Sequence, residues 1–231
     1  MASPELSRKS APCRLIVVGG HTRSIGKTQL ACDLIAALPE ANWLAGKITQ
    51  YGHGVCATNG HDCDCAPTEH VVAFDWESEA HAETDSARFL QAGASRSFWL
   101  RTKQGYLAEG MPLLRQALAE GTQTDAGDGL NVIVESNSLL QFVRPSLYVT
   151  VLDTAREDFK DSARHILDRA DVFVFRRGLD DGAIRQPPWM LVPTQLLRQK
   201  PSLLQREGQP LPDPLFQLVK RILQSPASVL V

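Results

Sequence analysis

The chain lacks any long apolar run, because no stretch approaches the roughly 20 residues that cross a bilayer. Its first ten residues contain no apolar core of the kind that a secretory signal has. It also lacks an excess of either charge, since 24 lysines and arginines stand against 26 aspartates and glutamates, a formal net charge of -2. No global field therefore draws it onto nucleic acid or anionic lipid. We expect a cytoplasmic protein that binds a small molecule or another protein, with no nucleic-acid or membrane partner.

Cysteine is scarce and unevenly placed. The chain has 5 cysteines, an odd number, so they cannot all pair in a disulfide framework. Cys13 and Cys32 stand apart, whereas Cys56, Cys63 and Cys65 lie within ten residues of one another. In the reducing compartment that we expect, such clustering favours metal binding or redox chemistry over disulfide bonds.

Short apolar runs predict alternating strands and helices. The run Arg14–Gly19 is continuous rather than alternating, as in a strand that is covered on both faces. From Lys27 to Leu38 apolar residues recur at helical spacing, and Pro39 ends that pattern. The sequence thus opens with a strand, a glycine-containing loop and a helix. Further strands are predicted at Trp43–Ile48, Val71–Trp76, Ser97–Arg101, Asn131–Glu135, Leu147–Leu152, Val172–Phe175 and Trp189–Val192.

Helices are predicted between several of these strands. Thr84 is a good cap for a helix that ends at Gly93, and Asp213 followed by Pro214 is typical of a helix start. Pro112 is expected near the start of another helix. A further helix is marked by one apolar face, formed by Phe159, Ala163, Ile166 and Leu167. Strands that alternate with helices predict an α/β protein of the P-loop NTPase fold, with a mostly parallel sheet flanked by helices on both faces.

The length and the order of patterns suit a single domain over residues 14–231. Residues 1–13 are mostly polar, and we expect them to form a disordered tail. Residues 52–70 interrupt the rhythm of strands and helices with a stretch that has no periodicity. Long loops without structure of their own are usually functional or disordered, so we interpret 52–70 as an insertion.

The loop between the first strand and the first helix has the pattern of a phosphate-binding loop. It consists of Gly20, His21, Thr22, Arg23, Ser24, Ile25, Gly26, Lys27 and Thr28. Backbone N–H groups in such a loop converge on phosphates, and the helix N-terminus adds unpaired donors and the positive end of its dipole. We expect Lys27 to bind the β- and γ-phosphates and the Thr28 hydroxyl to bind Mg²⁺. Arg23 either contacts phosphate or is solvated.

One position departs from the usual pattern of this loop. Counting back from Gly26, the slot of the first glycine is filled by His21, and Gly20 stands one residue earlier. A residue with a side chain has fewer backbone conformations available at such a turn than glycine has. The alternative interpretation of this segment is a chance Gly-Lys-Thr at a helix start.

A nucleoside triphosphatase also needs a carboxylate at the end of a neighbouring strand, where it holds Mg²⁺ through water or orients the attacking water. Three predicted strands end in a suitable residue: Asp75, Glu135 and Asp153. Ligands of open α/β sheets bind beyond the carboxyl ends of the strands, so each could reach the site. We favour Glu135, which follows the cleanest apolar run, and place Asp75 second. The predicted catalytic set is Lys27, Glu135 and Asp75, although acidic residues that close strands are ordinarily just solvated.

Four segments in order resemble a known family. They are the phosphate loop, the segment from Lys47 to His53, the segment from Thr84 to Ala94, and the apolar strand that ends at Glu135. Together they resemble the molybdopterin-guanine dinucleotide biosynthesis adaptor proteins (MobB). In that family a Lys-x-Thr-x-His-like segment, an Asp-Ser-x-Arg helix ending in Ala-Gly-Ala and a strand ending in Glu follow the phosphate loop. The resemblance spans roughly residues 15–135.

The resemblance implies a GTP-binding protein, commonly a homodimer, that assists a partner enzyme in finishing the molybdenum cofactor. It also implies that Asp85 and Arg88 lie near the nucleotide or the cofactor. The guanine-reading Asn-Lys-x-Asp sequence is missing, because the strand end where it is expected reads Phe175-Arg176-Arg177-Gly178. The base preference, GTP or ATP, stays open.

The predicted insertion is rich in metal-binding residue types. Three cysteines and three histidines lie within eighteen residues: His53, Cys56, His61, Cys63, Cys65 and His70. Thiolates and imidazoles are the ligands of Zn²⁺, Cu(I) or iron–sulfur centres, and four of the six would complete a tetrahedral site. We predict Zn²⁺ or another transition metal on Cys56, Cys63 and Cys65 with one histidine, for which His61 is our candidate. A redox-sensitive loop or a hydrated lid is the alternative.

These observations favour a slow GTP- or ATP-hydrolysing accessory protein that uses Mg²⁺ and assists cofactor assembly. A metal-delivering NTPase would instead couple release of an ion from the His/Cys insertion to hydrolysis. A nucleotide-sensing module without significant turnover is a third reading. The phosphate loop fixes only the phosphate donor, so a small-molecule kinase also remains open.

Overall fold

The computed structural model describes residues 12–51, 71–80, 83–122, 129–180, 183–184 and 187–229. The His/Cys insertion, with Cys56, His61, Cys63 and Cys65, lies outside the described residues, so its metal site stays a prediction. Residues 1–11 of the predicted tail lie outside them too. Pro12 and Cys13 already belong to the first strand, which therefore begins two residues before the predicted domain start.

Nine strands of the described residues form one sheet, in the order β10-β7-β6-β1-β5-β2-β4-β3 with β11 beside β1. The neighbours from β10 to β4 are all parallel, whereas β3 and β11 pair antiparallel. The strands are β1 (Pro12–Gly20), β2 (Leu44–Tyr51), β3 (Val72–Trp76), β4 (Arg96–Lys103), β5 (Leu130–Glu135), β6 (Leu147–Asp153), β7 (Val172–Arg177), β10 (Ser202–Leu204) and β11 (Ser228–Val229), while β8 (Leu179–Asp180) and β9 (Ala183–Ile184) form a separate hairpin.

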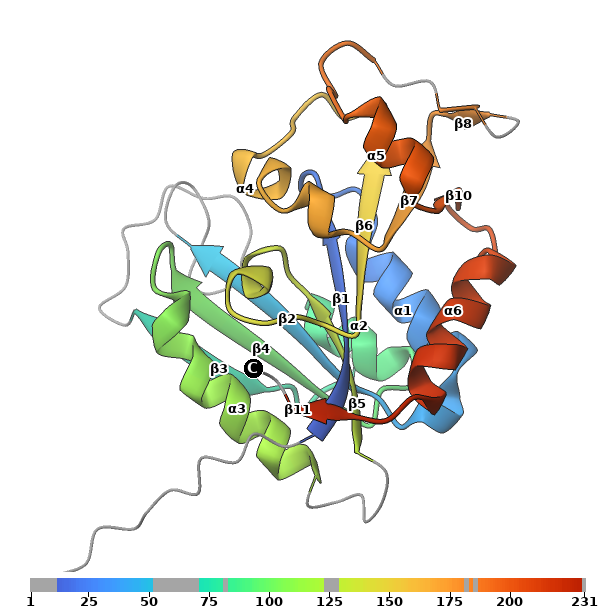
Figure 1. The fold of residues 1–231 in the computed structure, drawn as a ribbon. Helices are drawn as coiled ribbons and strands as arrows, with labels where there is room; N and C mark the ends of the chain where they lie inside the picture. Colours follow the sequence, from blue (N-terminus) through green and yellow to red (C-terminus); the bar gives the residue numbers. More distant parts are fainter. Residues whose placement is uncertain are drawn as a thin grey trace, which may run out of the picture.

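Helices cover both faces of this sheet (Figure 1). The helices of the described residues are α1 (Lys27–Ala37), α2 (Asp85–Gln91), α3 (Leu107–Thr122), α4 (Asp161–Arg164), α5 (Thr194–Gln199) and α6 (Asp213–Gln224), with 3-10 turns η1 (Pro39–Ala41), η2 (Ser138–Gln141) and η3 (Leu167–Arg169). One core cluster contains the inner residues of α1, α2 and α6, and the other contains those of α3, α4 and α5. The fold is thus the predicted α/β arrangement.

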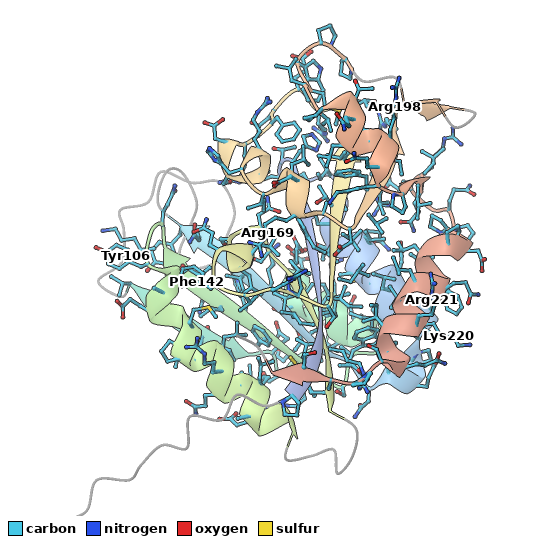
Figure 2. All side chains as sticks on the ribbon, in the orientation of Figure 1. Tyr106, Phe142, Arg169, Arg198, Lys220 and Arg221 are labelled. Carbon is cyan, nitrogen blue, oxygen red and sulfur yellow. The ribbon has the colours of Figure 1, made fainter. Side chains whose placement is uncertain are left out.

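Strand β1 shows why its sequence is continuously apolar. Leu15 and Val17 belong to the core cluster of α3, whereas Ile16 and Val18 belong to that of α1. Successive side chains of a strand point to opposite faces, so a strand with a helix layer on each face must be apolar at every position. The outer faces of the helices are polar, and Lys220 and Arg221 project outward from α6 (Figure 2).

Several local predictions are confirmed. Helix α1 begins at Lys27, directly after Gly26 of the loop, and α6 begins at Asp213. The Thr84 hydroxyl accepts a hydrogen bond from the backbone N–H of Ala87 at 3.1 Å, which makes Thr84 the cap of α2. Strand and helix ends differ from the predicted bounds by a few residues.

Three local predictions are corrected. The predicted strand Trp189–Val192 is a turn and irregular chain that precedes α5. Pro112 lies inside α3 rather than near its start. The helix predicted from the apolar residues between Phe159 and Leu167 is broken into α4 and η3, although all four marker residues are buried. The apolar pattern thus predicted correctly which side chains are buried, but the backbone between them is not one continuous helix.

Among the described residues, no helix has both the length and the apolarity of a membrane span.

Candidate functional site

A cleft of about 1410 Å³ lies at the carboxyl edge of the parallel strands. Residues 22–28 of the predicted phosphate loop line it. It is also lined by Glu135, Asp153 and Arg176, at the carboxyl ends of β5, β6 and β7, and by Lys47 and Trp99, from the middle of β2 and β4. The cleft therefore lies where ligands of open α/β sheets bind.

The end of the loop takes a conformation that requires glycine. Gly26 is the N-cap residue of α1 and has a φ of 86°, in the left-handed region. A Cβ atom at Gly26 would lie 2.8 Å from Nε of Arg176, so a side chain would clash there as well. The predicted glycine at this position is thus explained by both its backbone and its packing.

The start of the loop is held by a side chain that sequence reasoning missed. The N–H of Gly20 donates to Oδ1 of Asn137 at 2.9 Å, and Nδ2 of Asn137 donates to the Gly20 carbonyl at 2.7 Å. The N–H of His21 donates to the Val151 carbonyl at 3.3 Å. Both amides therefore already have partners, and neither Gly20 nor His21 lines the cleft. The part of the predicted loop that faces the cleft begins at Thr22.

His21 fills a buried position behind the loop. Its ring lies 5.2 Å from that of Phe159 and 6.1 Å from that of Trp189, and Nε2 lies 3.2 Å from the carbonyl oxygen of Arg156. His21 is absent from the residues with positive φ in the described chain, so its backbone suits a residue with a side chain. Burial lowers the pKa of His21. The side chain in the first glycine slot therefore anchors the loop to the segment around Arg156.

Lys27 lies over the loop that precedes it. Its Nζ donates to the backbone carbonyl of Thr22 at 2.5 Å. Burial lowers the pKa of Lys27, against the opposing effect of the Glu135 carboxylate. A buried ammonium is costly unless it is paired, so an anion in the loop would relieve its desolvation.

Thr28 and Glu135 are in direct contact. The Thr28 hydroxyl donates to Oε2 of Glu135 at 2.6 Å, and the Glu135 side chain is only 7% exposed. Glu135 pairs with Val18 of β1 and with Lys47 of β2, so the register of the sheet brings it beside the loop. A hydroxyl and a carboxylate are oxygen ligands of the kind that Mg²⁺ takes. The two residues therefore fit the predicted Mg²⁺ site.

Lys47 extends this row of charges. Its ammonium contacts the Asp85 carboxylate at the start of α2 and lies 3.7 Å from Oε1 of Glu135. Burial alone would lower the pKa of Lys47, but the carboxylates of Glu135 and Asp85 together raise it. Arg88 contacts Asp85 at 3.6 Å and donates to Gln29 of α1 at 2.7 Å. Asp85 and Arg88, implicated by the family resemblance, thus lie in the cleft beside the loop.

The structure does not bring Asp75 to the site. Strand β3 runs antiparallel to β4, so its carboxyl end lies toward the edge of the sheet opposite the loop. The Asp75 carboxylate pairs with Arg101, and its side chain is 60% exposed. Asp153, the third predicted strand end, does line the cleft, and its Oδ1 accepts from the N–H of Ala155 at 2.9 Å. Asp75 is therefore removed from the predicted catalytic set.

Arg176 holds the loop from the other side. Its Nη2 donates to the Gly26 carbonyl at 2.6 Å, and its Nη1 donates to Oε1 of Gln205 at 3.0 Å. Gln205 in turn donates to Asp33 of α1 at 2.8 Å. The sequence analysis considered the end of β7 only because the guanine-reading sequence is missing there, and it assigned no role to Arg176. Its position after an apolar run, at the same edge as Glu135, was the signal that could have identified it.

The comparisons with known proteins are sparse. No family model and no curated protein matches the chain. Among solved structures, the chain is similar to the Signal Recognition Particle 54 kDa protein from Aeropyrum pernix K1 in complex with GDP, with 16% identity and a TM-score of 0.44. The likeness covers 94% of this chain and 47% of that one, so the chain spans about half the length of that protein. The fold is an α/β P-loop fold. That assignment rests on the sheet order and on the loop between β1 and α1 described above.

Proposed function

We propose that this chain binds a nucleoside triphosphate together with Mg²⁺ and hydrolyses it slowly. The observation that carries the proposal is the contact between Thr28 and the buried Glu135, directly beside Lys27 in a glycine-bounded loop at a helix N-terminus. Loop amides, a lysine, a hydroxyl and a carboxylate are the groups that phosphoryl-transfer sites of this fold combine.

Each group has a distinct role in the proposal. The loop from Thr22 to Thr28 binds the phosphates through its backbone N–H groups, and Lys27 leaves the Thr22 carbonyl to pair with the β- and γ-phosphates. The Thr28 oxygen and the Glu135 carboxylate would hold Mg²⁺, and the metal would neutralise charge on the phosphates. Glu135 also orients the attacking water. The strand end Phe175-Arg176-Arg177-Gly178 lacks a guanine-reading sequence, so GTP and ATP are both candidate substrates.

The accessory role in cofactor assembly rests on the resemblance to the molybdopterin-guanine dinucleotide biosynthesis adaptors. It is supported by the positions of Lys47, Asp85, Arg88 and Glu135, since all four residues from the resembling segments line one cleft. On that resemblance we further propose a partner enzyme and a homodimeric state. Co-purification with a molybdenum-cofactor enzyme and the mass of the protein in solution would test these two points.

The nucleotide-binding proposal is tested by calorimetry of the full chain with GTP and ATP in the presence of Mg²⁺. Lys27→Ala removes a charged hydrogen-bond donor to phosphate, typically about 1.5–3 kcal/mol, so we expect at least about tenfold weaker binding. Lys200→Ala is a matched control, because Lys200 also donates to a backbone carbonyl, that of Asp168 at 2.6 Å, but lies outside the cleft. Equal affinity of wild type and a folded Lys27→Ala variant would remove the phosphate-loop assignment.

A further inference from the structure

Lys47 lines the cleft together with Lys27 and Lys160, and the roles proposed above do not use it. It lies on β2 opposite Glu135 of β5, and paired residues of neighbouring strands project from the same face. Its side chain is 21% exposed, so it is largely enclosed by the cleft wall. The sheet register thus places an ammonium group beside the Thr28 and Glu135 pair, to which the proposed function assigns Mg²⁺.

The contacts of Lys47 are with the groups that nucleotide binding would disturb. Glu135 divides its two oxygens between the Thr28 hydroxyl, at 2.6 Å, and the Lys47 ammonium, at 3.7 Å. The other partner of Lys47 is Asp85, at the start of a helix of seven residues. Lys47 therefore serves as the cation for a carboxylate that the proposed function assigns to Mg²⁺.

Binding of Mg²⁺ with a triphosphate would change the contacts that Lys47 makes with Glu135 and Asp85. The metal would take over the negative charge of Glu135, and its own positive charge would repel the nearby ammonium from that carboxylate. The terminal phosphate would at the same time bring new anionic acceptors to the Lys47 side of the cleft. A lysine can follow such a change, because its compact charge sits on a flexible four-carbon stem.

We propose that Lys47 is a specificity-determining residue that exchanges its contact with Glu135 for the terminal phosphate, so that the site distinguishes a nucleoside triphosphate from a diphosphate. This inference rests on the proposed nucleotide-binding function. Lys27 contacts the phosphates from within the loop, whereas Lys47 reaches them from β2. A triphosphate has a group for both lysines, and a diphosphate lacks the group that Lys47 reaches.

The experiment compares two affinities in the full chain, for a non-hydrolysable triphosphate with Mg²⁺ and for the corresponding diphosphate with Mg²⁺. Loss of one charged hydrogen bond to phosphate predicts about tenfold weaker triphosphate binding for Lys47→Gln. Its diphosphate affinity should change less than about twofold, and Lys47→Arg should recover most of the loss because it keeps the charge. Lys200→Gln, a lysine variant outside the cleft, should leave both affinities unchanged.

Asp85→Asn separates recognition of phosphate from a purely structural brace. If Lys47 only connects β2 to α2 through its ion pair with Asp85, then Asp85→Asn removes the same ion pair and must weaken triphosphate binding as Lys47→Gln does. If Lys47 binds the terminal phosphate, Asp85→Asn leaves triphosphate affinity equal or higher, because it releases a competing carboxylate. Equal losses of triphosphate and diphosphate affinity in Lys47→Gln, or no loss of either, would overturn the inference. Failure of the wild-type chain to bind either nucleotide would instead refute the proposed function, and this inference would fall with it.

Discussion

The two sides of the cleft are built differently. On the β5 and β2 side, Glu135, Lys47 and Asp85 form a row of alternating charges whose contacts are with other side chains. On the β6 and β7 side, Arg176 donates to the Gly26 carbonyl, and behind the loop the His21 ring contacts the carbonyl oxygen of Arg156. One side presents charges that can change partners, and the other fixes the path of the loop.

The two kinds of contact suit different roles, because one can bind a ligand and the other holds the loop in place. Side chains that contact one another can be re-paired by a ligand without moving the backbone. Side chains that contact the backbone hold a loop in one shape, and such pre-organisation is what a phosphate-binding loop needs. Changes on the first side should therefore alter nucleotide affinity or turnover in a folded protein. Changes on the second side should lower the stability of the fold. They should also weaken the binding of triphosphate and diphosphate by the same factor.

The largest effect is expected for Glu135→Gln. A carboxylate that orients the attacking water contributes typically about 10²–10⁴-fold to a rate, so single-turnover hydrolysis should slow by at least about 100-fold. Triphosphate affinity should fall much less, because the loop amides and Lys27 are untouched. Asp75→Asn is the matched control, since Asp75 lies on a strand of the same sheet but outside the cleft. Equal rates for wild type and Glu135→Gln would show that another group, such as Asp153, has this role.

A smaller effect, of a different kind, is expected for Arg176→Gln. The variant loses charged hydrogen bonds to Gly26 and Gln205, each typically worth about 1.5–3 kcal/mol, so the free energy of unfolding should fall by an amount of that order. Triphosphate and diphosphate affinities should fall by the same factor, because the loop itself loosens. Denaturant unfolding and calorimetry measure the two effects. The neighbouring Arg177 is exposed, and Arg177→Gln should change stability by less than about 0.5 kcal/mol. A selective loss of triphosphate affinity in Arg176→Gln would break the division between the two sides.

The smallest effect concerns pH. Burial lowers the pKa of His21 below its usual 6.5 in the folded chain, so the unfolded chain binds a proton more readily as the pH falls below 6.5. Stability should therefore fall with pH from about 6.5 downward, toward the lower pKa of the folded state. His21→Phe keeps a ring against Phe159 and Trp189 but cannot be protonated, so the urea midpoint of this variant should vary less between neutral and mildly acidic pH. An unchanged pH dependence in His21→Phe would show that His21 does not carry this effect.

The sequence predicted those parts of the site that follow from neighbours in the chain. The strand, the loop and the helix from β1 to α1 are contiguous, and glycine, lysine and threonine occur where a phosphate loop needs them. Glu135 was predicted beside them because parallel strands place their carboxyl ends at one edge. The same rule failed for Asp75, because it assumes a parallel strand and β3 is antiparallel. The direction of a strand depends on its connection, and the residues between β2 and β3 carry no pattern that reveals it.

By itself, the sequence determined the α/β class, the phosphate loop and the apolar faces of the helices, because each depends on spacing within a few turns or a single strand. Only the tertiary structure decided which distant side chains meet. Asn137 reaches Gly20, Arg176 reaches Gly26, and Lys47 lies between Glu135 and Asp85. These contacts depend on sheet order and register, which hydrogen bonds between strands far apart in the chain establish, and a shift of one residue would turn Lys47 or Glu135 to the other face.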